Sequence, residues 1–363
     1  MIVFIYGTTA EAIKLAPVMR RLDAREVPYQ QWVTFQHTEA LRTAMPQLGL
    51  RAPDRVIANG WRGKPLKKPV HMVGWMTTVG LWTLKNLGSL RRASRPSVVL
   101  VHGDTMTTVL GTFIGRLAGL PVAHVEAGLR SGDWRHPFPE ELDRRIVGRL
   151  AEVHYAPTDE TARNLAGRRN VIVTQGNTVK DAVRDSAAKR AGNPGEDVSD
   201  EPYGLVLLHR FEFISNLTLV RDTLQTLNDQ SPVALQVVVD SYSRDAIEEV
   251  IGELGLDRLT TAPKLEHAAF VERLQNAQLV VTDSGGVQEE SAVFGIPTLI
   301  HRMATERNEG LGTSALLSRW DQDVVRQFLQ DADAHRAGSD EVAASPSDII
   351  VEDLLARGYG TSS

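Results

Sequence analysis

Short apolar runs alternate along the chain with segments of helical periodicity. Residues 2–6 form the first run, which ends in the Gly7–Ala10 turn and is followed by the helical pattern Glu11–Leu22. Further apolar runs lie at Trp32–Phe35, Ser97–Val101, Val122–Val125, Val153–Ala156 and Val171–Thr174. Between them are helix-compatible segments such as Thr105–Ala118 and Pro139–Leu150. Continuous apolar strands that alternate with helices indicate a parallel sheet covered by helices on both faces.

The same alternation begins again at Gly204–Leu208. Later strands are predicted at Leu235–Val239, Leu279–Thr282 and Thr298–Ile300, and helices near Leu217–Leu227, Asp245–Leu254 and Ala268–Gln275. The Gly-, Pro-, Asp- and Glu-rich stretch Arg190–Tyr203 is typical of a linker or an insertion. We therefore expect an α/β protein with two doubly wound, Rossmann-like lobes. In such a protein the ligand lies in an interdomain cleft, at the carboxyl ends of the strands.

These patterns divide the chain into three parts. Residues 1–175 form the first Rossmann-like domain and residues 176–340 the second. Residues 341–363 form a tail in which the apolar pairs Ile349–Ile350 and Leu354–Leu355 favour one last docking helix.

Composition excludes several classes of protein. The 363 residues are 42% hydrophobic and 23% charged, and 40 basic against 45 acidic side chains give a net charge of -5. This balance predicts no nucleic-acid or membrane partner. The absence of Cys excludes disulfide scaffolds, thiolate metal sites and cysteine nucleophiles. No apolar run approaches the roughly 18 residues of a membrane span, and the apolar start reads as a strand, which predicts a cytoplasmic protein.

Candidate functional groups follow the predicted strands of the first half. The turn and helix start at Gly7–Ala12 can receive an anion, and Lys14 either supports a phosphate or is a surface lysine. Asp104 follows a strand, where it either caps the next helix or acts in catalysis. Glu126 also ends an apolar strand, where a charge is costly unless it is functional or paired, for example with Arg130.

The helix that begins after Pro139 carries a further pair of charges. Glu140 and Arg144 are four residues apart and share one helix face, so they form either a surface salt bridge or part of a site.

The second half offers groups suited to a diphosphate. His209 and Arg210 follow a strand and are candidate phosphate donors. Ser284, Gly285 and Gly286 follow another strand, and their backbone N–H groups would be free at a helix start. Glu290 is placed to accept hydrogen bonds from ribose hydroxyls. The charged residues just after the next strand, on the same rim, are Arg302, Glu306 and Arg307.

Together these segments resemble the non-hydrolysing UDP-N-acetylglucosamine 2-epimerase family, whose two-lobed fold is also found in many nucleotide-sugar glycosyltransferases (the GT-B-like fold). The strings that carry the resemblance are Gly7-Thr8, Glu11-Ala12-Ile13-Lys14, Ala16-Pro17, Gln36-His37, His102-Gly103-Asp104-Thr105 and His124-Val125-Glu126-Ala127-Gly128-Leu129-Arg130. In the same order follow Pro139-Glu140-Glu141 with Arg144, Gly176-Asn177-Thr178, His209-Arg210 with Glu212, Asp283-Ser284-Gly285-Gly286 through Glu290, and Thr305-Glu306-Arg307 with Glu309.

The resemblance implies a role for each of these groups. Asp104, Glu126 and Glu140 match acid/base carboxylates around C2 of the sugar. Lys14, Arg144 and His209 match groups near the diphosphate and the reacting sugar, and Ser284, Gly285, Gly286 and Glu290 match contacts to diphosphate and ribose. The resemblance also implies the reaction, in which UDP would be expelled from C1 to leave a 2-acetamidoglucal and would then re-add, converting UDP-GlcNAc into UDP-ManNAc. No metal or cofactor is expected, and family habit implies a homodimer.

The sequence also departs from the family pattern. Thr9 occupies the place of an arginine, Phe211 and Phe213 replace polar residues, and Met303 stands where an Asp is usual. Three alternatives remain: an active epimerase in which Arg210 or Arg302 compensates, a member with another UDP-sugar or a hydrolytic outcome, and a binder without turnover. From another class, a nucleotide-sugar glycosyltransferase shares the fold.

Overall fold

The computed structural model describes residues 1–66, 68–92, 97–131, 139–191, 201–240, 242–338 and 344–360. The chain forms two compact units: unit 1 comprises Met1–Ala182 and Ala343–Ser363, and unit 2 comprises Val183–Val342. The division falls within helix α7 (Val179–Ala191), between residues 175 and 202, where the sequence places the domain break, and the tail from residue 343 onwards belongs to unit 1. Residues 192–200 of the expected linker lie outside the described residues.

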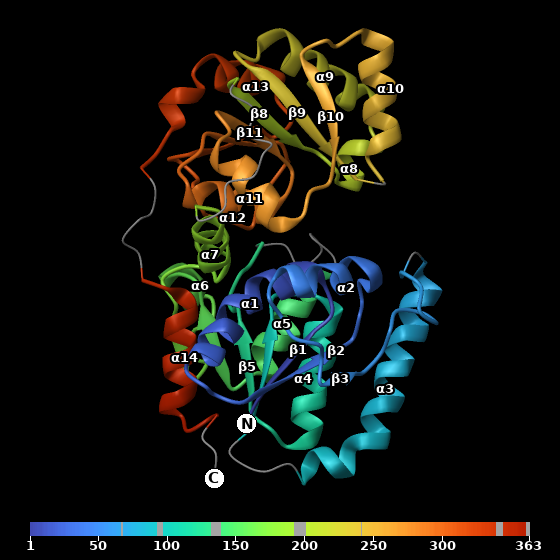
Figure 1. Ribbon diagram of the computed structural model, residues 1–363, viewed down its shortest axis with the longest axis vertical. Helices are drawn as coiled ribbons and strands as arrows, with labels where there is room; N and C mark the ends of the chain where they lie inside the picture. Colours follow the sequence, from blue (N-terminus) through green and yellow to red (C-terminus); the bar gives the residue numbers. More distant parts are fainter. Residues whose placement is uncertain are drawn as a thin grey trace. The chain divides into compact units, whose positions relative to one another are not determined.

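Unit 1 is built on a seven-stranded parallel sheet in the order β3-β2-β1-β4-β5-β6-β7 (Figure 1). Its strands are β1 (Ile2–Tyr6), β2 (Tyr29–Val33), β3 (Arg55–Val56), β4 (Val98–His102), β5 (Val122–Val125), β6 (Val153–Ala156) and β7 (Val171–Val173). The sheet grows in one direction from β1 and in the other from β4, so the switch point of the topology lies between these two strands. Each face of the sheet is covered by its own apolar core.

The helices that cover this sheet are α1 (Thr9–Ala24), α2 (Thr38–Gln47), α3 (Pro69–Arg91), α4 (Met106–Ala118), α5 (Glu140–Leu150), α6 (Asp159–Arg163), α7 and α14 (Pro346–Ala356). Helix α14, at the red end of the chain, lies beside α1 at the blue end (Figure 1). Ile350, Val351 and Leu354 of α14 are fully buried in the same core as β1 and α1. The predicted docking helix therefore completes unit 1.

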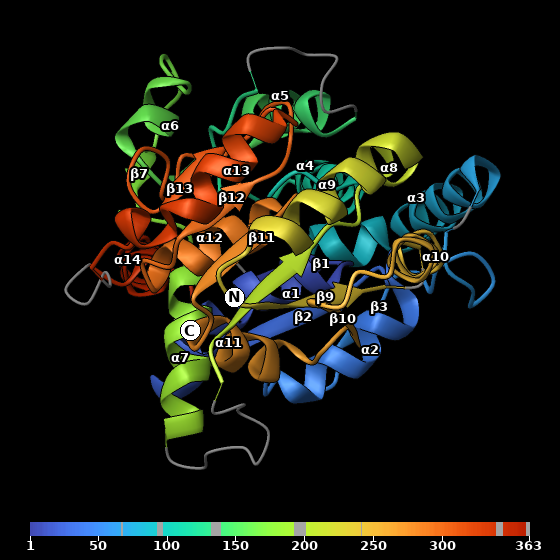
Figure 2. The same cartoon turned by 90° about the horizontal axis from the view of Figure 1, so that it is seen from above.

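Unit 2 repeats the design with six parallel strands in the order β10-β9-β8-β11-β12-β13. These are β8 (Tyr203–Leu207), β9 (Ala234–Val239), β10 (Leu259–Pro263), β11 (Leu279–Thr282), β12 (Thr298–Ile300) and β13 (Ala315–Leu317). Its helices are α8 (Phe211–Ile214), α9 (Leu217–Gln230), α10 (Arg244–Leu254), α11 (His267–Gln275), α12 (Gly285–Val293), α13 (Gln322–Gln330) and the short η1 (Ala332–His335). Helices α9 and α13 pack side by side (Figure 2). The switch point lies between β8 and β11.

The predicted fold class, two doubly wound α/β lobes, is confirmed. The predicted interior strands are present, whereas the edge strands β3, β10 and β13 had no counterpart in the prediction. Each of these pairs with a single neighbour, and β10 exposes most of its residues, so its sequence lacks the continuous apolar run of a buried strand. Among the described residues, no helix has both the length and the apolar character to span a bilayer.

We expect α14 to contribute to the stability of unit 1. Leu354→Ala removes a fully buried side chain and should lower the free energy of unfolding by about 2–5 kcal/mol. Leu355→Ala, next to it on the same helix but only partly buried, should cost less than half as much. Urea unfolding followed by circular dichroism measures both, and equal losses would contradict a specific docking of Leu354.

Candidate active site

Glu11 ties together the loops that follow the two central strands of unit 1. Its carboxylate accepts hydrogen bonds from the backbone N–H groups of Gly7 at 2.9 Å and Thr8 at 2.8 Å. The hydroxyl of Thr105, which lies in the loop after β4, donates to the same carboxylate at 2.8 Å. Burial raises the pKa of Glu11. The Gly7–Ala12 turn was predicted to receive an external anion, but Glu11 already occupies these two N–H groups.

The loops after β1 and β2 and the first turn of α4 also approach one another very closely. A Cβ atom on Gly7 would lie 2.1 Å from Thr34 Oγ1 and 2.4 Å from Thr107 Oγ1, so only glycine fits there. The hydroxyls of Thr34 and Thr107 are hydrogen-bonded at 2.8 Å, and the Thr107 backbone N–H donates to Gln36 Oε1 at 3.2 Å. The rim of the sheet is therefore a packed, hydrogen-bonded structure.

Glu126, directly after β5, is the centre of a buried polar cluster. Its Oε2 lies 2.7 Å from Lys14 Nζ, 2.5 Å from Asn177 Nδ2 and 3.3 Å from His102 Nε2. Its side chain is 1% exposed and that of Lys14 is 9% exposed. Lys14 is therefore not a surface lysine, and Glu126 forms its ion pair with Lys14, whereas the sequence offered Arg130 as one alternative partner.

The backbone at this turn is held in an unusual conformation. Glu126 has a φ of 65°, in the left-handed region that non-glycine residues rarely adopt. Two residues on, Gly128 has a φ of 86°, and a Cβ there would meet the Thr161 carbonyl oxygen at 2.1 Å. A left-handed non-glycine residue costs about 1–3 kcal/mol and occurs most often at functional sites. The turn thus directs a buried carboxylate to one fixed position.

Asp104 is paired with Arg144 and does not cap the helix that follows it. Thr105 is the N-cap of α4, because its side chain accepts the Thr108 N–H. Arg144 reaches Asp104 Oδ2 with Nε at 2.8 Å and with Nη2 at 2.6 Å. The Arg144 side chain is 4% exposed. The alternative of a surface salt bridge between Glu140 and Arg144 is therefore wrong.

Helix α5 presents three further carboxyl groups near this pair. Glu141 is fully buried and accepts hydrogen bonds from the Ser131 N–H at 3.1 Å and Arg145 Nε at 3.0 Å. Glu140 Oε2 is buried and has no hydrogen-bond partner among the described residues. Asp143 is 2% exposed, and its Oδ2 likewise has no partner within the described part of the chain. Burial, followed by the charges of Asp104 and Glu140, raises the pKa of Asp143 to about 7.

A comparable arrangement occurs at the switch point of unit 2, where Asp283 follows β11. Its Oδ2 accepts the backbone N–H groups of both His209 and Arg210 at 2.8 Å, and its Oδ1 lies 3.2 Å from His209 Nδ1. Arg210 Nε donates to the Asp283 carbonyl at 2.8 Å. The His209 side chain is 42% exposed. Asp283 thus holds the backbone of His209 and Arg210 through hydrogen bonds and lies close to one ring nitrogen of His209.

The predicted anion-binding turn of unit 2 is a capped helix start. Ser284 is the N-cap of α12, and its own N–H donates to Thr282 Oγ1 at 3.0 Å. Gly285 and Gly286 are the first two helical residues, and N–H groups at these positions have no partner within a helix. These two N–H groups can therefore receive an anion, together with the positive end of the helix dipole.

The other charged residues of unit 2 are mostly paired with protein groups. Glu290 Oε1 lies 3.0 Å from Nε2 of His267, a residue that no sequence signal indicated. Nη1 of Arg302 lies 3.4 Å from Oε2 of Glu306. Burial and the nearby Arg210 lower the pKa of Arg302.

Gln288 and Glu289, which lie shortly after the Asp283–Gly286 string, hold the loop that follows β12 in place. Arg307 forms a buried ion pair with Glu289 at 2.9 Å. Gln288 Nε2 donates to the carbonyls of Arg307 at 3.1 Å and Glu309 at 3.0 Å. Gln288 and Glu289 are therefore structural, although they belong to the matching string.

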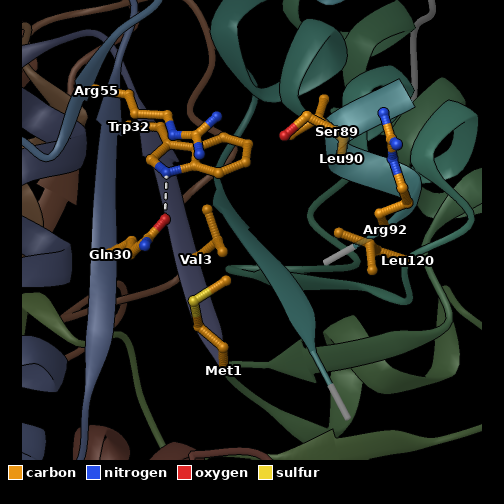
Figure 3. Close-up of a pocket in the computed structure, with 9 residues that line it drawn as sticks. All are labelled: Met1, Val3, Gln30, Trp32, Arg55, Ser89, Leu90, Arg92 and Leu120. Atoms are coloured by element: carbon orange, nitrogen blue, oxygen red, sulfur yellow. Dashed lines mark hydrogen bonds between the residues drawn. The ribbon is translucent and has the colours of Figure 1, made fainter. Parts of the chain in front are cut away.

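The described residues contain no group of three or more His, Asp or Glu side chains that could hold a metal ion. A cavity of about 440 Å³ lies in unit 1 beside the amino end of β1 (Figure 3). Its lining includes Met1 and Val3, at the amino end of β1, together with Trp32, Arg55 and Arg92. The candidate carboxylates follow the carboxyl ends of the strands, so this cavity is separate from them.

Known proteins share the sequence and the fold over nearly the whole chain. The sequence model of the family described as UDP-N-acetylglucosamine 2-epimerase matches residues 20–347. The UDP-N-acetylglucosamine 2-epimerase of Escherichia coli K12 is 33% identical over 364 residues, with 92% of each chain covered. That of Bacillus subtilis is 32% identical over 375 residues, with 97% of this chain and 94% of the relative covered.

Solved structures also match this chain over nearly its whole length. The UDP-GlcNAc 2-epimerase of Neisseria meningitidis, determined with UDP-GlcNAc bound, has a TM-score of 0.82 and 25% identity, with 98% of this chain and 99% of that chain covered. The S. aureus MnaA–UDP co-structure has a TM-score of 0.78 and 27% identity, with 98% and 96% covered.

Fold and site together define a two-lobed, GT-B-like α/β protein with polar clusters at both switch points. Within that class, the chain belongs to the UDP-N-acetylglucosamine 2-epimerase family, as the resemblance predicted.

The buried Lys14–Glu126 pair predicts a non-additive stability effect. Lys14→Met leaves the Glu126 charge without its cation and should cost about 3–5 kcal/mol of unfolding free energy. Glu126→Gln in the same chain removes that charge, so the double variant should be more stable than the sum of the single effects by at least about 1 kcal/mol. Lys85→Met, at an exposed lysine, is the control and should change stability by less than about 0.5 kcal/mol. Additive effects in urea unfolding would show that the pair contributes no interaction energy.

Proposed function

We propose that the protein is a UDP-N-acetylglucosamine 2-epimerase of the non-hydrolysing type, which interconverts UDP-GlcNAc and UDP-ManNAc. Family membership supports the substrate, and one observation carries the chemistry. Glu126 is a buried carboxylate on a left-handed backbone, next to Lys14 and near the loop that holds Asp104. A protein that only bound the nucleotide sugar would gain nothing from this costly arrangement.

The reaction itself requires carboxylates. The C2 proton of an N-acetylhexosamine has no neighbouring carbonyl, so its direct removal would leave an unstabilised carbanion. When the C1–O bond breaks and the diphosphate oxygen takes its electron pair, the C2–H electrons form a C1–C2 double bond and the proton passes to a base. The reverse addition, with a proton delivered to the other face of C2, gives the epimer. Bases and acids are therefore needed around the ring.

The environments of the three carboxyls suit different parts of this cycle. Lys14 and Asn177 stabilise negative charge on Glu126, and Arg144 does the same for Asp104. Glu140 has an oxygen without a donor, so it can take up or release a proton without breaking a hydrogen bond there. We assign proton transfer at C2 to these three residues, with Lys14 and Arg144 as the cations that hold two of them in place.

In this proposal, residues of unit 2 bind the diphosphate and the ribose. His209 and Arg210, both held by Asp283, present cationic or N–H donors, and Gly285 and Gly286 present backbone N–H groups at the start of α12. Donors of this kind stabilise the charge that develops on a departing diphosphate. Ser284 caps that helix start, Glu290 remains the candidate for the ribose hydroxyls, and Arg302 adds positive charge near Arg210.

Two alternative activities are considered: hydrolysis, which Thr9 suggests, and glycosyl transfer, which the fold permits. Thr9 stands where the family resemblance implies an arginine, and its hydroxyl is buried without a partner in the described structure, so the loss of a guanidinium could favour release of free sugar and UDP. A glycosyltransferase has the same fold and would need an acceptor. Incubation with UDP-GlcNAc alone separates these cases, because epimerisation needs no second substrate.

Proton NMR of UDP-GlcNAc with the protein in deuterated water should show UDP-ManNAc with deuterium at C2, because the proton taken up by a carboxyl exchanges with solvent. Glu126→Gln and Asp104→Asn should each lower the rate by at least about a hundredfold and leave the Kd for UDP within about threefold. Asp159→Asn, at an exposed carboxylate of unit 1, is the control and should retain the full rate. Free sugar with UDP would support hydrolysis, and substrate without deuterium at C2 would contradict the proposal.

We also propose a homodimer formed through α3 and α4. Four apolar side chains of α3, namely Val70, Val73, Leu81 and Leu84, are each more than 60% exposed. Phe113 and Leu117 of α4, which packs beside α3, are 43% and 46% exposed. Exposed apolar side chains on two neighbouring helices are typical of a subunit interface.

A charge placed in this surface should dissociate the dimer. Leu84→Glu is expected to convert the protein to a monomer in light scattering at micromolar concentration, whereas Lys85→Glu, the adjacent exposed position, should leave it dimeric. A wild-type protein that is already monomeric, or a Leu84→Glu variant that stays dimeric, would exclude this interface.

A further inference from the structure

His124 of β5 makes a buried hydrogen bond for which the proposed reaction has so far given no role. Its side chain lies in a residue that is 1% exposed, and its Nε2 is 2.7 Å from the carbonyl oxygen of Gly103. A carbonyl oxygen can only accept, so Nε2 carries the ring proton. Nδ1 is buried without a partner among the described residues, as expected for the nitrogen that has no proton.

The ring of His124 acts as a neutral donor. Burial lowers the pKa of His124 to about 3, so the imidazole is uncharged at neutral pH. A group with this pKa neither takes up nor releases a proton near pH 7. The contribution of His124 must therefore come from its position and its N–H group.

Gly103, which accepts this hydrogen bond, lies directly before Asp104. It follows β4 with a φ of 67°, in the left-handed region, and it is buried. Its own N–H donates to the Val125 carbonyl at 3.0 Å. Both backbone groups of Gly103 are therefore bonded to β5, one to the main chain and the other to the His124 ring.

These two hydrogen bonds lie next to both of the carboxylates that Lys14 and Arg144 hold. Asp104 follows Gly103 directly, and Glu126 follows Val125 directly. In the register of the sheet, the last residue of β4 is opposite Val125, the last residue of β5. The two carboxylates thus leave neighbouring strands at the same level, and the His124 side chain ties the turn before one of them to the strand before the other.

We propose that His124 is a positioning residue that holds the Gly103 turn, so that Asp104 keeps a fixed place relative to Glu126. This inference rests on the proposed epimerase function, in which both carboxylates act at one carbon atom. A displacement of about 1 Å in a reacting group can lower a rate about a hundredfold. Binding of UDP, which the proposal assigns to unit 2, does not depend on this turn.

His154 offers a matched comparison on the next strand. It lies opposite His124 in the register between β5 and β6, and it is likewise 1% exposed. Its Nδ1 has no partner within the described part of the chain, and β6 carries none of the three carboxyls assigned to C2. Loss of His154 therefore removes a buried imidazole without releasing the Gly103 turn.

Replacement of His124 by leucine and by glutamine is the test. His124→Leu removes the donor, whereas His124→Gln keeps an N–H group at a similar reach. We expect His124→Leu to lower kcat for UDP-GlcNAc about ten- to a hundredfold, with KM and the Kd for UDP within about threefold. His124→Gln should recover most of kcat and keep the wild-type pH profile, because the ring transfers no proton. His154→Leu is the control and should keep the wild-type kcat.

Amide hydrogen exchange supplies a second measurement, which does not depend on activity. The Gly103 N–H should exchange at least about tenfold faster in His124→Leu than in the wild type, because the turn opens more easily when its carbonyl has lost a donor. His124→Gln should keep the wild-type protection. Should the leucine variant not fold, His124→Asn gives the same comparison, because its shorter amide cannot reach the Gly103 carbonyl.

The two measurements separate the possible failures. A wild-type kcat in His124→Leu, an equal loss in His124→Gln, or an equal loss in His154→Leu would each overturn the positioning role. Unchanged Gly103 exchange in His124→Leu would exclude the link between the ring and the turn. If the wild type shows no epimerisation while Gly103 exchange responds as expected, the proposed function fails and the catalytic role of His124 fails with it, although the link stands.

Discussion

The reversal of strand order between β1 and β4, and again between β8 and β11, is the constraint on which both polar clusters depend. At these points the loops after two adjacent strands lead away in opposite directions, and the ends of the strands remain uncovered by a crossover helix. Polar side chains can gather there because the faces of the sheet are covered by helices, whereas the strand ends at the switch point are open. In unit 1 they are joined by Glu11 and in unit 2 by Asp283.

Many residues of the matching strings turn out to hold the loops in place. Glu11 binds two loops together, Glu141 anchors the start of α5, and Gln288 and Glu289 secure the segment after β12. Such contacts must be rigid if a few remaining groups are to meet a substrate with constant geometry. A shared string is therefore evidence of a shared scaffold as much as of shared ligand contacts.

The sequence predicted the interior of the fold well, because strands buried on both faces have continuous apolar runs that helices and loops lack. It also predicted polar groups at the ends of β4, β5 and β11, where the structure has Asp104, Glu126 and Asp283. The sequence did not predict which side chains form ion pairs with these carboxylates. Local spacing offered Arg130 as one alternative partner for Glu126 and helix capping as one alternative role for Asp104, whereas tertiary packing brings Lys14 and Arg144 to them.

Other features left no trace in the sequence. His267 reaches Glu290 only because α11 and α12 pack together, and no spacing in the chain records that contact. The edge strand β10 exposes most of its residues, and β13 has only three residues, so neither shows the long apolar run of a strand buried on both faces. The burial of Asp143 likewise depends on the packing around α5, and one acidic residue among several in a helix gives no signal of its own.

Charge balance explains why the carboxyl groups at the strand ends of unit 1 have such different environments. A nucleotide diphosphate sugar is an anion, and a lobe that brought five ionised carboxylates to its reacting end would repel it. Lys14 and Arg144 neutralise two of them by direct ion pairs. For Glu11 and Asp143, burial raises the pKa and so favours the uncharged form. Each neutralised or protonated carboxyl lowers this repulsion, so in the proposed mechanism the arrangement that permits binding would also leave acid and base groups for chemistry at C2.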